Sequence, residues 1–187
     1  MLLARHTQSF PFDRVADGSV VTIGSFDGLH LGHRALLEHV FAQSRQLGLP
    51  AIVMSFEPTP KEFFQADKPP ARLMRFREKF EALAATGVDI FFCPRFDEAM
   101  KNIAADTFIR QILVHAMNVR HLVIGDDFRF AQDREGHLAT LQRAGNAIGF
   151  SVEQVSSVVE AGARVSSSVI RDALWMGELD KAAQLLG

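Results

Sequence analysis

The sequence predicts a doubly wound α/β fold, in which helices cover both faces of a mostly parallel β-sheet. Short apolar runs of strand length alternate along the chain with longer stretches whose apolar residues recur at helical spacing. No internal repeat or low-complexity segment interrupts this alternation. The 187 residues, of which 48% are hydrophobic and 22% charged, are sufficient for one hydrophobic core without disulfide or metal support. We therefore expect residues 1–187 to form a single domain.

The apolar runs define the expected elements. Strands are expected at residues 20–24, 51–56, 88–93, 121–125 and 150–155. Helices are expected between and after them, at residues 31–47, 76–86, 104–117, 136–148, 169–176 and 179–186. Gly87 is expected to end the second helix, because glycine readily adopts the left-handed conformation at a helix end. A β-hairpin is expected across Glu160–Ala163.

The stretch between the second strand and the second helix is rich in proline. Residues 57–70 include Pro58, Pro60, Pro69 and Pro70. Proline lacks the backbone N–H that a helix interior or a strand ladder requires. The whole stretch is therefore predicted to be a loop.

The alternation of strands and helices also predicts how the strands are arranged. Right-handed crossovers give a Rossmann-like sheet of five strands in the order 3-2-1-4-5, numbered along the chain. In such a sheet, ligands bind beyond the carboxyl ends of the strands, at the point where the strand order reverses. The segments 24–28, 56–60 and 125–130 follow strands one, two and four. All three segments are expected to face one cleft.

Composition and charge exclude several classes of protein. The net charge of −2 argues against a nucleic-acid-binding protein, which would carry a broad basic surface. No apolar run approaches membrane-spanning length, and the first twenty residues contain charged side chains at Arg5, Asp13, Arg14 and Asp17. The single cysteine, Cys93, excludes an internal disulfide. We expect a cytoplasmic protein with no nucleic-acid or membrane partner.

The segment that follows the first strand has the features of a phosphate-binding turn. Gly24 and Gly28 bracket the turn into the first helix, where free N–H groups attract anions. His30 and His33 are spaced to lie on one face of the first helical turn, and Gly32 between them leaves room for a nucleotide. The remaining residues of the turn are Ser25, Phe26 and Asp27. Fixed donors at this position would stabilise charge that builds on a phosphoryl group.

Two other interpretations of this segment are open. One is a glycine-containing helix start with two solvated histidines. This interpretation does not explain why several glycines and two histidines occur together at one strand-to-helix junction. The other is a zinc site formed by His30, His33 and a carboxylate such as Asp27. The zinc site is less favoured, because no further histidine or cysteine cluster accompanies it and the glycines have no role in it.

Several segments of the sequence resemble the motifs of a known family. The segment Gly24-Ser-Phe-Asp-Gly-Leu-His-Leu-Gly-His33 resembles the HxGH signature of the nucleotidyltransferase superfamily. Its FDG-containing form is similar to the FMN adenylyltransferase module of bacterial bifunctional riboflavin kinase/FAD synthetases. Four further segments are similar to that family's motifs in order and spacing, at residues 56–60, 71–79, 125–130 and 166–171. The resemblance implies transfer of AMP from ATP to FMN, giving FAD and pyrophosphate, with Mg²⁺ bound by the phosphates.

The resemblance implies roles for the turn and for the serine-rich element near the carboxyl end of the chain. His30, His33 and Arg171 would act on the reacting phosphates, and Ser167 and Ser168 would help to bind ATP. Arg164 would be a nearby cation. Helix capping by the serines is an alternative that requires no ligand. Capping does not account for an arginine expected in the first helical turn, where a cation opposes the helix dipole and requires an anion such as a triphosphate.

The flavin half of the site rests mainly on the resemblance. It would be formed by Phe56, Pro58, Pro60, Asp127, Phe128 and Phe130. Aspartates also favour turns, and phenylalanines more often pack in the core than stack on a ligand, so both simpler interpretations are open for these residues. The sequence departs from the family at Ala131, where the family usually has glycine, and at Ser168, where it often has threonine.

The chain reaches Gly187 where the family normally continues into a riboflavin kinase barrel. We therefore expect kinase activity to be absent from these residues and a kinase domain to follow in the full-length protein. Two alternative functions are open: another HxGH nucleotidyltransferase, acting on pantetheine phosphate or nicotinamide nucleotide, and a sensor that binds a flavin or nucleotide without turnover.

Overall fold

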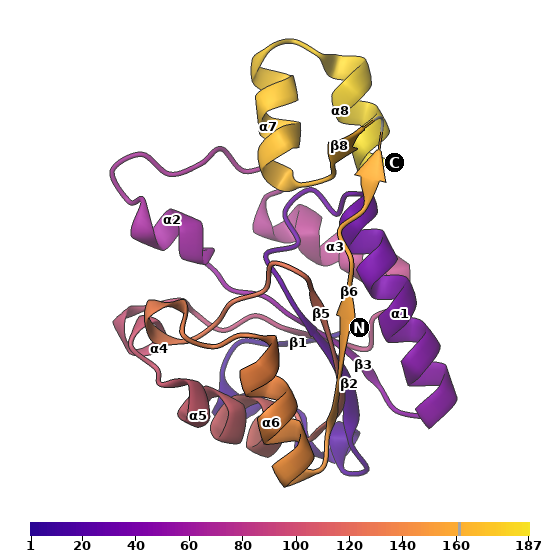
Figure 1. The fold of residues 1–187 in the computed structure, drawn as a ribbon, viewed down its shortest axis with the longest axis vertical. Helices are drawn as coiled ribbons and strands as arrows, with labels where there is room; N and C mark the ends of the chain where they lie inside the picture. The colour runs from indigo at the N-terminus through magenta and orange to yellow at the C-terminus, as the bar shows by residue number, and fades with distance from the viewer. Residues whose placement is uncertain (161) are drawn as a thin grey trace.

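The computed structural model describes residues 1–160 and 162–187 and shows a central parallel sheet of six strands (Figure 1). The strand order is β1-β4-β3-β2-β5-β6. The strands are β1 (Leu2–Ala4), β2 (Ser19–Ile23), β3 (Ala51–Met54), β4 (Ile90–Phe92), β5 (Val119–Gly125) and β6 (Ser151–Val155). The order of the five expected strands is confirmed, and all neighbouring pairs are parallel. The expected count was one too low, because β1 is a short edge strand with Leu2 and Leu3 exposed.

The helices expected from the sequence are present, with their ends shifted by no more than two residues. The one expected at 104–117 consists of a short α-helix followed by a π-helix, and two short helices, at 60–64 and 98–101, were not expected. The helices are α1 (Leu31–Leu47), α2 (Pro60–Phe64), α3 (Phe76–Thr86), α4 (Glu98–Lys101), α5 (Ala105–Thr107), the π-helix η3 (Phe108–Ala116), α6 (Leu138–Ile148), α7 (Ser167–Trp175) and α8 (Leu179–Leu186). Short 3₁₀ turns occur at η1 (Thr7–Ser9), η2 (Phe12–Val15) and η4 (Gln132–Arg134). Gly87 ends α3 with a φ of 96°, as predicted. In the part of the chain that the structure describes, no helix is long and apolar enough to cross a membrane.

The hydrophobic core lies in two layers, one on each face of the sheet. Val21 belongs to a buried cluster that includes Leu113 of η3 and Leu141 of α6. Val20, its neighbour in β2, belongs to a second cluster with Leu37 of α1. Successive side chains of a strand point to opposite faces, so one strand contributes to both layers. The expectation of helices on both faces is confirmed, and this packing fixes where the strands end.

The prediction that residues 57–70 form only a loop is wrong, because α2 begins at Pro60. The first residue of a helix needs no N–H partner, and the fixed φ of proline suits this position. A capping box completes the start of the helix. The Thr59 side chain accepts a hydrogen bond from the N–H of Glu62, and the Glu62 carboxylate accepts one from the N–H of Thr59 at 2.7 Å. Pro60 therefore starts a helix here.

The carboxyl-terminal part of the chain stands above the carboxyl ends of the strands (Figure 1). The predicted hairpin is present as β7 (Val159–Glu160) and β8 (Ala163–Arg164), which pair antiparallel. Ala161, which the prediction also included, lies outside the described residues. Helix α7 begins at Ser167, two residues earlier than expected, because the Ser166 hydroxyl accepts a hydrogen bond from the N–H of Val169 and caps the helix. Helices α7 and α8 pack on each other around their own small apolar cluster.

The loop after β5 carries backbone strain at the position where the family usually has glycine. Ala131 has φ 65° and ψ −176°, a region that is essentially restricted to glycine. We expect Ala131→Gly to raise the free energy of unfolding by about 1–2 kcal/mol, because glycine adopts this conformation without a steric cost. Denaturant unfolding measures this effect. The control is Ala42→Gly in the middle of α1, which should lower the stability by about 1 kcal/mol. A loss of stability in both variants would contradict the strain at Ala131.

Candidate active site

The turn after β2 is closely packed against the rest of the chain. Phe26 and Leu29 adopt left-handed φ angles of 47° and 40°, and Gly28 has a φ of 91°. The φ of Gly28 favours glycine at this position, and a Cβ atom there would also lie 2.8 Å from Leu73 Cδ1, so that the leucine side chain would have to shift. A Cβ at Gly32 would lie 3.3 Å from the ring of His30, which fills the space beside it. The protein's own side chains therefore account for both glycines.

The structure brings the two predicted histidines into direct contact. Their rings stack with 3.7 Å between centroids and 15° between planes. His30 is the N-cap residue of α1, and its Nδ1 accepts a hydrogen bond from the N–H of His33 at 3.3 Å. The ring of His33 also packs on Phe26, with centroids 4.8 Å apart. The hydrogen bond at the start of α1 and the contact with the buried ring of Phe26 therefore hold both imidazoles in position.

Burial keeps both imidazoles neutral at physiological pH. Desolvation lowers the pKa of His30 to about 4. Burial, together with His30 and the Lys79 ammonium, lowers the pKa of His33 well below its usual value. Because Nδ1 of His30 accepts a hydrogen bond, the proton of the neutral ring resides on Nε2. The two rings are therefore hydrogen-bonding groups rather than cations at pH 7.

One ring nitrogen in this pair lacks a partner. Nδ1 of His33 and Oγ1 of Thr22 are the buried side-chain polar atoms that have no hydrogen bond among the described residues. An unpaired buried polar atom is costly and uncommon outside functional sites. The unpaired His33 nitrogen makes this turn a candidate for contact with a bound group.

The depressed pKa of His30 predicts a loss of stability in acid. Unfolded His30 takes up a proton near pH 6.5, whereas folded His30 stays neutral down to about pH 4. The free energy of unfolding should therefore fall between these pH values, by roughly 3 kcal/mol from this residue. The variant His30→Asn retains a capping side chain and should show a shallower fall. Equal slopes for the two proteins in pH-dependent denaturant titrations would contradict the prediction.

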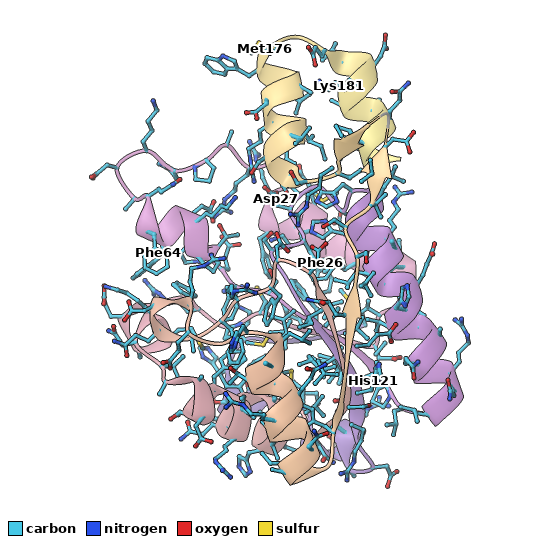
Figure 2. The ribbon with its side chains drawn as sticks, viewed as in Figure 1. Phe26, Asp27, Phe64, His121, Met176 and Lys181 are labelled. Atoms are coloured by element: carbon cyan, nitrogen blue, oxygen red, sulfur yellow. The ribbon has the colours of Figure 1, made fainter. Side chains whose placement is uncertain are left out.

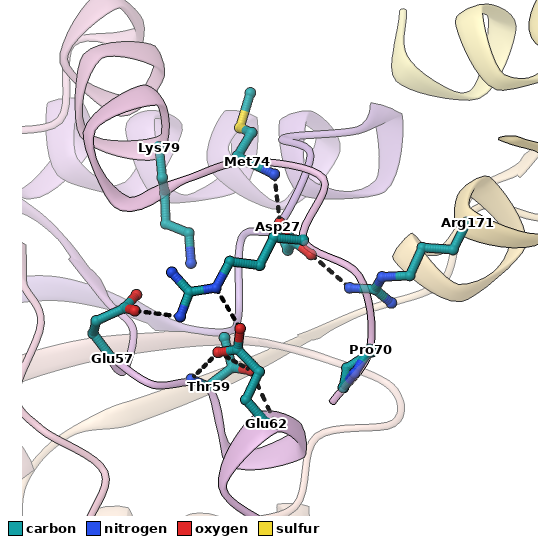
Figure 3. Close-up of a pocket in the computed structure, with 9 residues that line it drawn as sticks. Asp27, Glu57, Thr59, Glu62, Pro70, Met74, Lys79 and Arg171 are labelled. Atoms are coloured by element: carbon teal, nitrogen blue, oxygen red, sulfur yellow. Dashed lines mark hydrogen bonds and ion pairs between the residues drawn. The ribbon is translucent and has the colours of Figure 1, made fainter. Parts of the chain in front are cut away.

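Asp27 links the turn to two distant segments (Figure 2). Its buried carboxylate accepts hydrogen bonds from the N–H groups of Leu73 at 3.0 Å and Met74 at 2.9 Å. It also forms an ion pair with Arg171 of α7 at 2.5 Å (Figure 3). Nε of Arg171 donates a hydrogen bond to the carbonyl of Ala71. The anion that the sequence required beside Arg171 is therefore present within the protein. Arg171 lies at the fifth position of α7, beyond the first turn where it was expected.

These contacts weigh against the zinc site considered from the sequence. The Asp27 carboxylate is already bonded to two N–H groups and one guanidinium. Within residues 1–160 and 162–187, no group of three or more His, Cys, Asp or Glu side chains is arranged to hold a metal ion. The stacked histidines and Asp27 thus form an organised turn with hydrogen-bonding functions.

Lys79, the last residue of the family-like segment 71–79, is a residue of this site to which the sequence assigned no role. Lys79 is a buried residue of α3, and its Nζ donates a hydrogen bond to the carbonyl of Ser25 at a distance of 2.7 Å. Burial lowers the pKa of this ammonium. A pocket beside it contains the ion pairs of Arg72 with Glu57, at 2.6 Å, and with Glu62 (Figure 3). The resemblance included this lysine in a motif, but helical periodicity does not show that its side chain points inward, which only the fold reveals.

The serine-rich element contacts the turn directly. The Ser167 hydroxyl donates to the carbonyl of Asp27 at 2.8 Å. The Ser168 hydroxyl accepts a hydrogen bond from Nζ of Lys61 at 3.3 Å. Capping thus accounts for Ser166 alone, whereas Ser167 and Ser168 face other segments. The element and the turn form one continuous site.

The structure pairs two of the predicted ligand-binding residues with each other. Arg164 forms ion pairs with Asp127 at 2.8 Å and with Asp126 at 3.3 Å. Asp126 also accepts hydrogen bonds from the backbone N–H and the hydroxyl of Ser157. All of these charged groups are exposed. The contacts join the loop after β5 to the hairpin at the edge of the site.

A cavity of about 500 Å³ opens beside the turn, at the carboxyl end of β2. Phe56, Pro60, Phe128 and Phe130 line it, as the sequence expected for the flavin half of the site. Pro58 and Asp127 are not among the lining residues. The wall is mainly apolar and aromatic, and it also contains the cations Lys61, Lys101, Arg129 and Arg134. A flat apolar ring system that carries a negative group fits this lining.

The fold and this site together define a doubly wound α/β protein, with a parallel sheet and an HxGH turn at the switch point. The chain belongs to the FAD synthetase family, whose family model matches residues 13–169.

Relatives of known name agree with this assignment. A bifunctional riboflavin kinase/FMN adenylyltransferase of Escherichia coli strain K12 is 47% identical over 171 residues, which are 91% of this chain and 55% of that protein. The protein of the same name from Haemophilus influenzae is 43% identical over 175 residues, which are 94% of this chain and 57% of that protein. The chain therefore spans little more than half of these relatives.

Two solved structures share the fold. A macrolide-efflux protein from Streptococcus pneumoniae superposes with a TM-score of 0.84 at 25% identity, over 100% of this chain and 59% of the other. A pantoate-β-alanine ligase from Francisella tularensis superposes with a TM-score of 0.57 at 13% identity, over 100% of this chain and 85% of the other. The second likeness concerns the fold alone.

Proposed function

We propose that this chain is an FMN adenylyltransferase, which transfers AMP from ATP to FMN in the cytoplasm and releases pyrophosphate. The observation that carries the proposal is the meeting of two features at the end of β2. The turn with the stacked neutral histidines follows Ile23, and Ile23 also lines the aromatic cavity. The turn proposed to bind phosphate is therefore adjacent to an apolar cavity, and the names of the relatives support the same pair of substrates.

In the proposed reaction, a phosphate oxygen of FMN attacks the α-phosphorus of ATP. A new P–O bond forms, the bond to the bridging oxygen of the β-phosphate breaks, and pyrophosphate leaves. Mg²⁺ would enter with ATP on the phosphate oxygens and balance part of their charge. The residues of the chain position the phosphates and donate hydrogen bonds to them.

The proposal assigns a role to each group of residues. His30 and His33 would donate hydrogen bonds to oxygens on which charge develops. N–H groups of the segment 24–28 other than that of Gly24, which is bonded to the carbonyl of Met54 at 3.0 Å, would bind the nucleotide phosphates. Ser167 and Ser168 lie beside this turn and would bind the rest of the triphosphate, as would Arg171. The guanidinium of Arg171 has five N–H donors, so it can contact a phosphate while it retains Asp27. Asp127 and Arg164 would act as a pair at the edge of the site.

Flavin binding is assigned to the aromatic cavity. Phe56, Phe128 and Phe130 would pack on the isoalloxazine, with Pro60 in the same wall and Pro58 stiffening the loop before it. The relatives also carry riboflavin kinase in their names. We assign residues 1–187 to the adenylyltransferase part as a single domain and expect them to lack kinase activity, with a kinase domain following in the full-length protein.

The proposal is tested by product formation. The chain is incubated with ATP, Mg²⁺ and FMN, and FAD and pyrophosphate are quantified; equal amounts of both are expected. Riboflavin in place of FMN should yield no FMN. Turnover of pantetheine phosphate or nicotinamide mononucleotide instead of FMN would favour another nucleotidyltransferase. Binding of ATP and FMN without product would favour a sensor, and either result overturns the proposal.

A further inference from the structure

Lys61 connects the aromatic cavity with the serine-rich element. It is the second residue of α2, the helix that the sequence did not predict, and it lines the cavity. Its Nζ donates a hydrogen bond to the hydroxyl of Ser168 at 3.3 Å, across 107 positions of sequence. The neighbouring Ser167 is bonded to the phosphate-binding turn through the carbonyl of Asp27. One ammonium group therefore lies at the junction of the two substrate regions.

Lys61 differs from most of the cations around the site in having no carboxylate partner among the described residues. Four of them have carboxylate partners: Arg72 with Glu57 and Glu62, Arg171 with Asp27, Arg164 with Asp126 and Asp127, and Lys101 with Glu98. The lining residues Arg129 and Arg134 also form no ion pair with a described carboxylate, but neither is hydrogen-bonded to the serine-rich element. No carboxylate of the described residues forms an ion pair with Lys61, whose partner is a neutral hydroxyl. Its positive charge is available to an incoming anion, and a hydroxyl partner is easily exchanged for a phosphate oxygen.

We propose that Lys61 binds the phosphate of FMN and thereby distinguishes FMN from riboflavin. This inference rests on the proposed function. The apolar wall of the cavity suits the ring system, which leaves the phosphate for a cation of the lining. Lys61 is the lining cation that also contacts the serine-rich element, where ATP is proposed to bind. An FMN phosphate held by Lys61 would face the α-phosphate that it attacks. Lys61 is thus a positioning residue for the acceptor and a determinant of specificity.

The test compares two flavins and three variants. Lys61→Met removes the charge and retains an apolar stem, and Lys61→Arg retains the charge. Lys68→Met is the matched control, because Lys68 is an exposed lysine just beyond α2 that lines neither cavity. Flavin fluorescence gives the Kd of each protein for FMN and for riboflavin. Steady-state assays give kcat and the KM values for FMN and ATP, and circular dichroism checks the fold.

Lys61→Met should weaken FMN binding about tenfold and leave riboflavin binding unchanged, because a charge-assisted hydrogen bond to the phosphate is lost. The KM for FMN should rise while the KM for ATP stays constant, and Lys61→Arg should retain most of the preference for FMN. Equal weakening for both flavins would reduce Lys61 to part of the apolar wall. A rise confined to the KM for ATP would assign it to the triphosphate, and no change would leave it without a ligand; each of these outcomes overturns the inference.

Failure of the proposed function has a different signature. A wild-type chain that binds FMN but forms no FAD would contradict adenylyl transfer, and the comparison of FMN with riboflavin binding would still decide the role of Lys61. A wild-type chain that forms FAD and binds both flavins equally would retain the function and overturn the inference.

Discussion

Asp27→Ala is expected to lower the free energy of unfolding by about 3–5 kcal/mol. The substitution leaves the largely buried guanidinium of Arg171 without its partner and two backbone N–H groups, those of Leu73 and Met74, without their acceptor. The cost is dominated by the unpaired charge and donors that remain, rather than by the lost ion pair itself. Urea or guanidinium titration measures the effect.

Two further variants separate this cause from a general effect of removing an aspartate. The double variant Asp27→Ala/Arg171→Met removes both charges. Its loss of unfolding free energy should be smaller than the sum of the losses in the two single variants. Asp106→Ala is the control, because Asp106 forms an exposed ion pair with Arg110 at 2.8 Å on one helical face. It should cost less than about 1 kcal/mol. Additive single variants, or an equal loss at Asp106, would show that Asp27 is not a structural link.

His33→Ala is expected to lower kcat for FAD formation by about 10²- to 10³-fold, the usual loss when one preorganised hydrogen-bond donor is removed. The stacked contact with His30 holds the imidazole in place before the substrate arrives, and burial keeps it neutral. Alanine is compatible with the helix, but loss of the packed ring should lower the stability, so kcat is measured under conditions in which the variant is fully folded. Because the donor acts mainly on developing charge, kcat should change more than the KM for ATP.

The control for this variant lies on the same helix. His39→Ala removes another imidazole of α1, one that is exposed and forms its contact with Glu153 on β6. It should leave kcat unchanged. Normal turnover by a correctly folded His33→Ala protein, judged by circular dichroism and unfolding, would exclude the proposed role of His33. A large loss at both positions would indicate disruption of α1 rather than loss of a donor.

The order of the five predicted strands was accessible from the sequence because each forms an apolar run, and the crossovers between them have a fixed hand. The end of α3 was accessible for a local reason as well, since Gly87 ends it in a left-handed conformation. The strand β1 was missed because three residues at a sheet edge carry no distinctive pattern. Helix α2 was missed because Pro60 can either interrupt or begin a helix, and the capping box at Thr59 decides between these two.

Part of the candidate site was likewise predictable from the sequence, and part of it was not. The two histidines and the glycine turn are close in sequence, so their spacing indicated a shared face, and the stacked rings agree with it. The partners of Asp27 and Lys79 lie 46 or more positions away in sequence, and no local pattern could identify them. For the same reason, the sequence assigned the compensating anion of Arg171 to a triphosphate, whereas the fold supplies it from Asp27.

The sequence by itself thus determined the α/β class, the strand order of the predicted core and the position of the HxGH turn, because these depend on periodicity and short-range spacing. Tertiary structure alone decided which charges are neutralised within the protein and which side chain is available to a ligand. Burial of His30 and His33, the ion pair of Asp27 with Arg171, and the hydroxyl contact of Lys61 all arise where segments far apart in the chain meet above the carboxyl ends of the strands. Electrostatic function depends on such long-range contacts and on desolvation, and neither is encoded in the local pattern of residues.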